Sequence, residues 1–266
     1  MSILTARLAA ARAEGRSALV SYLPVGYPNV ETSVAAMAAT VEGGADIVEI
    51  GVPYSDPGMD GPTIQRAVDV AVRSGVGMRD VLRAVEGVAA AGGVPMVMSY
   101  WNPIERYGIA RFARDLVAAG GAGAITPDLI PDEAADWIAA ADEADLDRVF
   151  LVAPSSTDAR LAMTSAACRG FVYAASTMGV TGTRDAVSSV APALVARVRA
   201  VSDLPVAVGL GVSTGTQAAE IARYADAVIV GSAFVRALLD AADDGAGVLA
   251  ARELAAELAA GVRQRP

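Results

Sequence analysis

Short apolar runs of strand length alternate with helical patterns along almost the whole chain, and this alternation limits the fold more than any other feature. Eight strand–helix units in about 250 residues, without a break in composition, indicate an α/β protein with a (β/α)₈ TIM barrel. A doubly wound parallel sheet of similar length is the alternative on pattern alone. The predicted strands cover residues 17–23, 46–51, 95–100, 122–126, 148–153, 170–174, 205–209 and 227–231.

Helical patterns fill the intervals between these strands, and an extra N-terminal helix precedes the first one. We expect a single TIM-barrel domain over residues 1–266. Catalytic groups of a barrel gather where its strands end, so the longest loops there, residues 53–62 and 176–188, are candidate lids. The predicted helices cover residues 2–14, 31–42, 104–119, 131–144, 188–201, 233–242 and 248–262.

The charge and hydropathy patterns exclude several kinds of partner. A net charge of -9 argues against binding to nucleic acid or to an anionic membrane. The longest uncharged run, residues 87–104, contains Pro95 and suits a helix end, a turn and a buried strand better than a membrane span. The charged amphipathic pattern around Arg12 and Glu14 is unlike a secretion signal, and we expect a cytoplasmic protein.

Two residue types that are absent restrict the chemistry. The chain has no histidine, and all 21 of its basic residues are arginine. Schiff-base catalysis, lysine-bound pyridoxal phosphate, the phosphate-loop lysine and histidine-based triads or zinc sites are therefore excluded, and we expect no metal. The single cysteine, Cys168, cannot form an internal disulfide and is predicted to be a small buried hydrophobe.

Two acidic residues are the strongest candidates for proton transfer. Glu49 lies inside an apolar strand, where an ionised carboxylate is costly unless it is paired or used. Asp60 follows eleven residues later in the loop, so the two predict an acid/base pair. A structural role is the alternative for both, since Asp-Gly-Pro is also an ordinary turn sequence. Asp56 and Asp128 are second-tier candidates, Asp128 as a helix cap or as a group that orients a neighbour.

Glycines at the ends of the last two strands predict a phosphate site. Residues 209–213 read Gly-Leu-Gly-Val-Ser, and Gly231-Ser232 begins a helix. Glycines let backbone amides approach an anion, and a helix N-terminus offers free N–H donors. The loops after strands seven and eight are the usual phosphate position in barrels, and Gly182 is a further candidate amide. Tight turns without a ligand are the alternative.

Aromatic and apolar residues at the strand ends predict a flat slot for a ring-shaped substrate. Ordinary barrel core is the alternative, and it is the default for Met98, Ile125 and Ile229. For the tyrosines the substrate slot is favoured over ordinary core, because a buried hydroxyl needs a hydrogen-bond partner. The set consists of Tyr22, Met98, Tyr100, Ile125, Tyr173, Leu210 and Ile229.

These same segments resemble the tryptophan synthase α-subunit family. The resemblance rests on EIGVPYSDP at 49–57, DGPTIQ at 60–65, GVTG at 179–182 and GLGV at 209–212, supported by YLPVGYP at 22–28 and YWNP at 100–103. The segments occur in the order expected for the family and run along essentially the whole chain. The pair Glu49 and Asp60, with the loop between them, is the most specific part of the match.

The resemblance implies cleavage of indole-3-glycerol phosphate to indole and glyceraldehyde 3-phosphate. In that case Glu49 is the mobile acid/base, and Asp60 accepts a hydrogen bond or proton from the indole N–H. The subunit itself needs no metal or organic cofactor. By the same resemblance Tyr173 positions the substrate near Asp60, and Thr181 closes over it. The expected substrate-binding residues are Tyr22, Tyr100, Ile125, Tyr173, Thr181, Gly182, Leu210, Gly211, Gly231 and Ser232, of which Gly182, Gly211, Gly231 and Ser232 hold the phosphate.

The resemblance also implies a partner, the pyridoxal-phosphate β-subunit that consumes indole, in an α2β2 assembly. Residues 53–60 would form part of the docking surface. Gly58 stands where the family usually has a larger aliphatic residue, so the loop is expected to be looser and the partner affinity lower. A stand-alone indole-releasing lyase and a non-catalytic activator of a β-like partner remain alternatives. Indole-glycerol-phosphate synthase is disfavoured, because its chemistry needs lysine.

Overall fold

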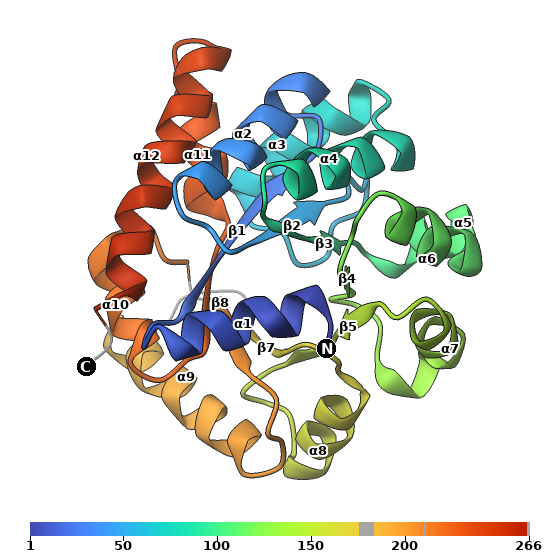
Figure 1. Ribbon diagram of the computed structural model, residues 1–266, viewed down its shortest axis with the longest axis vertical. Coiled ribbons are helices and arrows are strands. Elements are labelled where there is room, and N and C mark those ends of the chain that lie inside the picture. Colours follow the sequence, from blue (N-terminus) through green and yellow to red (C-terminus); the bar gives the residue numbers. More distant parts are fainter. Residues whose placement is uncertain (176–183, 210, 265–266) are drawn as a thin grey trace.

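The computed structural model describes residues 1–175, 184–209 and 211–264. Its strands form one parallel sheet in the order β5-β4-β3-β2-β1-β9-β8-β7-β6. Figure 1 shows the strands at the centre with the helices around them. The strands are β1 (Ala18–Pro24), β2 (Ile47–Gly51), β3 (Val94–Met98), β4 (Gly123–Ile125), β5 (Asp147–Val149), β6 (Leu151–Val152), β7 (Val172–Ala175), β8 (Val206–Gly209) and β9 (Ala227–Val230).

The two edge strands of this sheet are halves of one interrupted strand. Only Phe150 separates β5 from β6, and the predicted strand 148–153 covers both. The sheet passes through this residue, because the Phe150 carbonyl accepts a hydrogen bond from the Tyr173 N–H while the Val149 carbonyl accepts one from Thr126. The strands therefore form a nearly closed barrel, and the predicted TIM barrel is confirmed.

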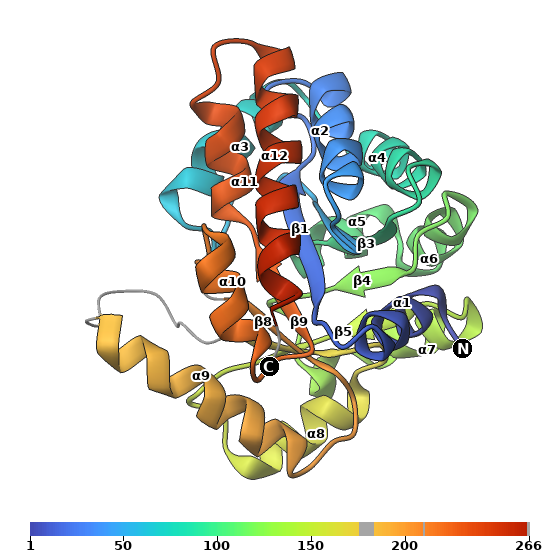
Figure 2. The ribbon, with the colours of Figure 1, turned by 60° about the vertical axis from the view of Figure 1, so that its left-hand side comes forward.

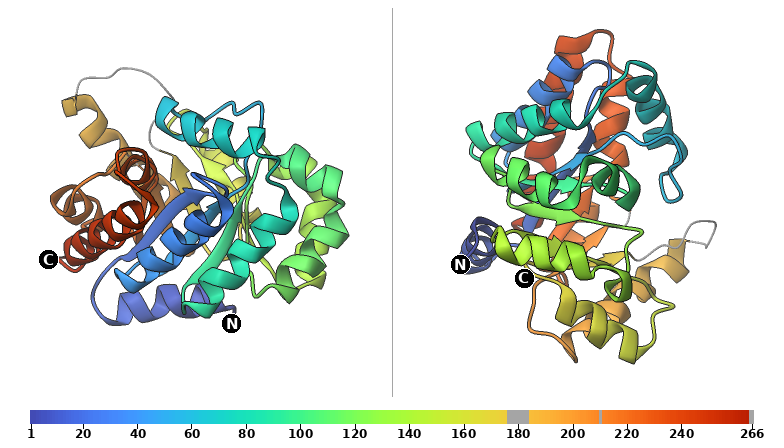
Figure 3. Two further views of the ribbon diagram at one scale, coloured as in Figure 1. Left: turned by 90° about the horizontal axis from the view of Figure 1, so that it is seen from above. Right: turned by 90° about the vertical axis from the view of Figure 1, so that its right-hand side faces the viewer.

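The helices occupy the intervals that the sequence pattern predicts, with different boundaries. Figure 3 shows from two further directions that they surround the strands. The helices are α1 (Ile3–Ala13), α2 (Val30–Glu42), α3 (Pro62–Arg73), α4 (Met78–Ala90), α5 (Trp101–Tyr107), α6 (Ile109–Ala118), α7 (Ala135–Glu143), α8 (Asp158–Ala167), α9 (Arg184–Arg199), α10 (Gly215–Ala222), α11 (Ser232–Leu239) and α12 (Asp244–Val262), and a 3₁₀ turn, η1, covers Pro131–Glu133.

Three helix predictions need correction. The single helix predicted at 104–119 is two helices, because Gly108 has a φ of 98° and ends α5 before α6 begins. The helix predicted to begin at residue 131 opens with η1 and becomes α-helical only at Ala135. The last helix begins at Asp244 instead of residue 248, because the Asp243 side chain accepts a hydrogen bond from the Ala246 N–H and caps it earlier.

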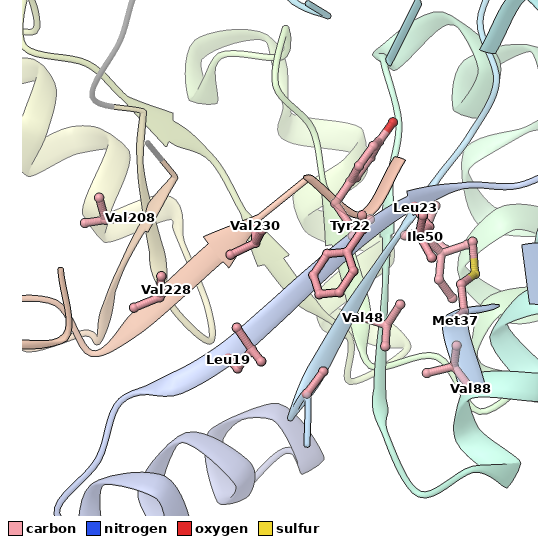
Figure 4. Close-up of a cluster of buried hydrophobic side chains, with 14 of the residues drawn as sticks. Leu19, Tyr22, Leu23, Met37, Val48, Ile50, Val88, Val208, Val228 and Val230 are labelled. Carbon is pink, nitrogen blue, oxygen red and sulfur yellow. The ribbon is translucent and has the colours of Figure 1, made fainter. Parts of the chain in front are cut away.

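Side-chain alternation along the strands divides the core into two layers. In β1, Val20 belongs to a cluster inside the barrel, whereas Leu19 packs outward against the helices. Figure 4 shows part of the outer layer, with Val48 of β2 on the same side as Met37 of α2. In Figure 2 the long helix α12 lies beside α2 and α11, which completes the outer wall.

The extra N-terminal helix closes one end of the barrel. Leu4 and Leu8 of α1 are buried among the interior side chains, and each contributes about 1.5–3 kcal/mol by burial. Just after α1, the Arg16 guanidinium binds both oxygens of Asp46 at 2.6 and 2.9 Å, and both side chains are buried. This closed end lies at the beginning of the strands, so the opposite end is left for a ligand.

Candidate active site

A cavity of about 310 Å³ opens where the strands end. Its wall combines residues from β1, β2, β3, β6, β7, β8 and β9 with residues that follow β2, β3, β4, β8 and β9. This is the end of the barrel at which active sites are built. The predicted site residues on its wall are Tyr22, Glu49, Asp60, Tyr100, Tyr173, Gly211, Gly231 and Ser232.

Glu49 contributes a buried carboxyl group to the cavity. Its residue pairs with Tyr22 of β1 and Met96 of β3 in the parallel register, and it is only 1% exposed. Its Oε1 atom has no hydrogen-bond partner among the described residues. Burial raises the pKa of Glu49 to about 8, so the carboxyl is mostly protonated at neutral pH and can donate a proton.

Asp60 reaches the same cavity from the loop between β2 and α3. The Tyr100 hydroxyl lies 3.3 Å from its Oδ1 atom and donates to it. Burial raises the pKa of Asp60, and the hydrogen bond from Tyr100 opposes that shift by stabilising the carboxylate. The two acids thus differ: Glu49 is buried without a partner for Oε1, whereas Asp60 has a donor for its ionised form.

The β3–α5 segment holds this loop through three contacts. The Tyr100 hydroxyl accepts a hydrogen bond of 2.8 Å from the Met59 N–H. The Tyr54 and Tyr100 rings lie 5.3 Å apart, and the Asn102 amide donates to the Tyr54 hydroxyl at 3.2 Å. A side chain placed at Gly58 would meet no atom within 4 Å, so this loop position is open. The position of Asp60 therefore depends on the hydrogen bond from Tyr100 and on these contacts of its neighbours.

Glycines make room for two of the tyrosine rings. A Cβ atom at Gly51 would lie 2.6 Å from the Tyr22 hydroxyl oxygen, and one at Gly209 would lie 2.9 Å from that of Tyr173. Both distances are shorter than a real Cβ contact. These strand-end glycines therefore let each tyrosine ring lie across the end of the neighbouring strand. The sequence analysis assigned such glycines only to tight turns or phosphate contacts, so it did not predict this role.

The glycines predicted to bind a phosphate contribute backbone groups to the wall of the cavity. Gly211 has a φ of 63°, and a Cβ there would point into open space. Gly231 precedes α11, whose first N–H groups have no intrahelical partner and point towards the N-terminal side. Ser232 adds a hydroxyl at that helix start. These groups suit an anion, because they offer donors and a favourable helix dipole without needing lysine.

The remaining predicted site residues are not among the described residues of the cavity wall. Ile125 is fully buried in the interior cluster and is not part of the cavity wall. Thr181, Gly182 and Leu210 lie outside the described residues. Asp128 accepts a hydrogen bond from the Trp101 N–H, so it orients the start of α5 and does not cap the helix that follows it.

Sequence reasoning missed several residues of the cavity wall. Met59 and Ile64 come from the loop and from the first turn of α3, and neither position has a local pattern that distinguishes it. Leu151 has a detectable signal, because it lies near the end of the predicted fifth strand. Cys168 fits its prediction, since it is a free and buried thiol whose pKa is raised by burial to about 11.

Two further classes of site were sought among the described residues. Within residues 1–175, 184–209 and 211–264, no cluster of three or more cysteine or acidic side chains could bind a metal ion. In the same part of the chain, every helix is too short or too polar to span a bilayer.

Residues 8–263 match the family model described as tryptophan synthase alpha chain. The chain belongs to that family. The tryptophan synthase alpha chain of Mycobacterium marinum is 68% identical over 254 residues, which are 96% of this chain and 92% of the relative.

Solved structures of family members agree with this assignment. A tryptophan synthase structure from Mycobacterium tuberculosis superimposes with a TM-score of 0.92 at 62% identity, covering 98% of each chain. Tryptophan synthase subunit alpha from Legionella pneumophila superimposes with a TM-score of 0.89 at 30% identity, also covering 98% of each chain.

As a member of the tryptophan synthase alpha chain family, the protein is a carbon–carbon lyase of tryptophan biosynthesis. It cleaves indole-3-glycerol phosphate to indole and glyceraldehyde 3-phosphate. Its partner is the tryptophan synthase β-subunit. The alpha chain has no cofactor of its own, and pyridoxal phosphate belongs to the β-subunit.

Proposed function

We propose that Glu49 and Asp60 together carry the cleavage of indole-3-glycerol phosphate. The observation that supports this assignment is the placement of both carboxyl groups on the wall of one cavity, in environments that favour different protonation states. Breaking the bond between indole and its side chain requires a proton on C3 of the ring. It also requires the loss of a proton from the neighbouring side-chain hydroxyl.

Glu49 transfers both protons. With its pKa at about 8, the protonated form is available to donate to C3 of the indole ring. Once the ring is protonated it becomes an electron sink, and the same carboxylate removes the side-chain hydroxyl proton as the carbon–carbon bond breaks. Indole leaves, the oxygen becomes the aldehyde oxygen of glyceraldehyde 3-phosphate, and Glu49 returns to its protonated state.

Asp60 stabilises the positive charge that this protonation creates. Its carboxylate accepts a hydrogen bond from the indole N–H and acts electrostatically on the cationic ring. The hydrogen bond from Tyr100 favours the ionised form that this role needs. A contribution of this kind is worth about 10²–10³ in rate.

The phosphate and the ring are held by the remaining site residues. Gly211, Gly231 and Ser232 bind the phosphate through backbone N–H groups and a hydroxyl, and Tyr22, Tyr100 and Tyr173 form the slot for the indole and its side chain. From the family resemblance we add Thr181, which closes over the ligand, with Gly182 at the phosphate and Leu210 at the ring.

The protein is a single cytoplasmic domain over residues 1–266, and it assembles with the β-subunit as α2β2. Residues 53–60 form part of the docking surface for that subunit. Met59 in this loop is 52% exposed, which gives a partner an apolar contact. Gly58 leaves an open position in this loop, and we expect the isolated chain to have low activity. Binding of the β-subunit orders Asp60 and raises that activity.

The test is indole release from indole-3-glycerol phosphate by the purified chain, with and without the β-subunit. We expect slow release by the chain alone and a clear increase with the partner. Glu49→Gln and Asp60→Asn should each remove most turnover and leave binding of a phosphate ligand largely intact. Retention of wild-type turnover by either variant would refute the proposed roles.

The same assay separates two other functions. Equal turnover with and without the β-subunit at saturating substrate would identify a stand-alone indole-releasing lyase. A wild-type chain that stimulates the β-subunit but releases no indole would be a non-catalytic activator. The carboxyl pair in one cavity favours the catalytic function over the activator.

A further inference from the structure

The Tyr22 ring lies in a slot between glycines at the ends of β2 and β9, the two strands that flank β1. On one side, a Cβ atom at Gly51 would lie 2.6–2.8 Å from the hydroxyl oxygen and two ring carbons. On the other, a Cβ atom at Gly231 would lie 3.3 Å from the ring Cδ1. The ring therefore extends from the start of α11, where the phosphate is proposed to bind, to Gly51 at the end of β2. Glu49 lies two residues before Gly51 on the same strand.

The hydroxyl at the end of this ring has no hydrogen-bond partner among the described residues, although Tyr22 is only 8% exposed. The hydroxyls of Tyr54, Tyr100 and Tyr107 have partners. Among the described residues of the cavity wall, Tyr173 shares the unpaired state of Tyr22, but its hydroxyl lies beside Gly209 of β8 and not beside β2. Tyr22 lies on the cavity wall, and its hydroxyl is not one of the fully buried polar atoms. The hydroxyl is therefore open to an acceptor that a ligand supplies.

The surroundings keep the Tyr22 hydroxyl protonated. Burial, followed by the negative charges of Asp60 and Glu49, raises the pKa of Tyr22 well above its usual value of 10. The group is therefore a hydrogen-bond donor over the whole physiological pH range. It is not a base, so removal of a substrate proton remains with Glu49, whose residue is the register partner of Tyr22.

We propose that the Tyr22 hydroxyl donates a hydrogen bond to the side-chain oxygen of indole-3-glycerol phosphate that loses its proton during cleavage. This inference rests on the proposed function. The substrate side chain connects the phosphate with the ring, and Tyr22 extends between the two ends of the cavity where these groups are placed. As the carbon–carbon bond breaks, the oxygen gains negative charge and becomes the aldehyde oxygen, and Tyr22 keeps its own proton throughout.

Tyr22→Phe tests the contact, because it keeps the ring in its slot and removes only the donor. Two ligands separate the hydroxyl contact from packing: the substrate itself, and indole-3-propanol phosphate, which has the ring and the phosphate but no side-chain hydroxyls. In the complex with the β-subunit, we expect kcat for the substrate to fall about tenfold or more. The Kd for indole-3-propanol phosphate should change less than twofold.

Tyr107→Phe is the matched control. The Tyr107 hydroxyl donates to Asp115 at 2.6 Å and lies outside the cavity wall, so this variant also loses a tyrosine hydrogen bond but should keep kcat and Kd unchanged. The thermal unfolding temperature of Tyr22→Phe should match that of the wild type, which excludes misfolding as the cause of lost turnover.

Two results with Tyr22→Phe would overturn the contact while the proposed function stands. One is unchanged kcat in the variant with normal wild-type turnover. The other is an equal loss of affinity for both ligands, which would mean that Tyr22 acts by packing or through Glu49. If the wild-type complex released no indole, the proposed function would fail and this contact with it.

Discussion

Tyr100 holds Asp60 through one hydroxyl group that serves two hydrogen bonds. It donates to the Asp60 carboxylate at 3.3 Å and accepts from the N–H of the preceding residue, Met59, at 2.8 Å. Tyr100 follows β3, whereas Asp60 lies in the loop after β2. The same tyrosine therefore sets both the position of the loop backbone and the charge of its acid.

Tyr100→Phe should change the pH dependence of turnover. The hydrogen bond lowers the pKa of Asp60, so its removal raises that pKa and makes the carboxylate available only at higher pH. We expect the acidic limb of the kcat/KM profile to move upward in pH, with a loss of about tenfold or more below the limb. A parallel loss at every pH would mean that Tyr100 acts only on loop position.

Glu49→Gln should separate stability from activity. The folded-state pKa of Glu49, about 8, lies above its usual value of 4.5, so the unfolded chain gives up this proton first as the pH rises. The wild type should therefore lose stability between about pH 4.5 and pH 8, on the order of a few kcal/mol. Glutamine cannot ionise, so the variant should lack this loss.

Urea unfolding of both proteins at pH 5.5 and pH 8 measures the effect of this substitution. We expect the variant to gain stability relative to the wild type at pH 8 and much less at pH 5.5, while its indole release is abolished at both. The same stability difference at the two pH values would contradict a raised pKa for Glu49.

Gly211→Ala should weaken phosphate binding more than it slows the chemistry. Gly211 has a φ of 63°, which costs an alanine about 1–2 kcal/mol, although its Cβ would meet no atom within 4 Å. The loop should relax and move its N–H groups. We expect KM to rise several-fold with kcat nearly unchanged, and the Kd of indole-3-propanol phosphate to rise in parallel. A selective loss of kcat would remove Gly211 from the phosphate site.

Asp46→Ala should destabilise the closed end of the barrel without affecting the cavity. The change removes the carboxylate that binds the buried Arg16 guanidinium at 2.6 and 2.9 Å and leaves only the exposed Glu14 as its acidic partner, so we expect a cost of up to about 3–5 kcal/mol. Asp69→Ala is the matched control, because its pair with Arg73 is exposed and is worth about 0–1 kcal/mol. KM measured well below the unfolding temperature should not change in either variant.

Local pattern was enough to predict the barrel and its acid pair. The strand-length apolar runs have to be buried, and eight of them in regular alternation with helices leave few arrangements. Glu49 was identifiable because an acid inside an apolar strand is costly, and Asp60 because it follows on the same loop. Both inferences depend only on neighbours in sequence.

The sequence predictions were wrong where a backbone conformation or a contact between distant residues decides the structure. The break at Gly108 depends on a positive φ that a helical pattern conceals, since glycine also occurs within helices. Ile125 was assigned to the slot from its place at a strand end, but its side chain packs into the closed interior. Strand position indicates the face of a side chain and not whether ligand-accessible space lies in front of it.

The sequence by itself determined the architecture and the chemistry available: a barrel without lysine or histidine, in which proton transfer is left to carboxylates, tyrosine, the lone thiol or water. Only the tertiary structure decided which groups meet. In the folded chain the Tyr100 hydroxyl donates a hydrogen bond to Asp60, the Tyr22 ring lies between Gly51 and Gly231, and α1 covers the far end of the barrel. The reason is physical, because burial and periodicity act along short stretches of chain, whereas these contacts join strands that only folding brings together.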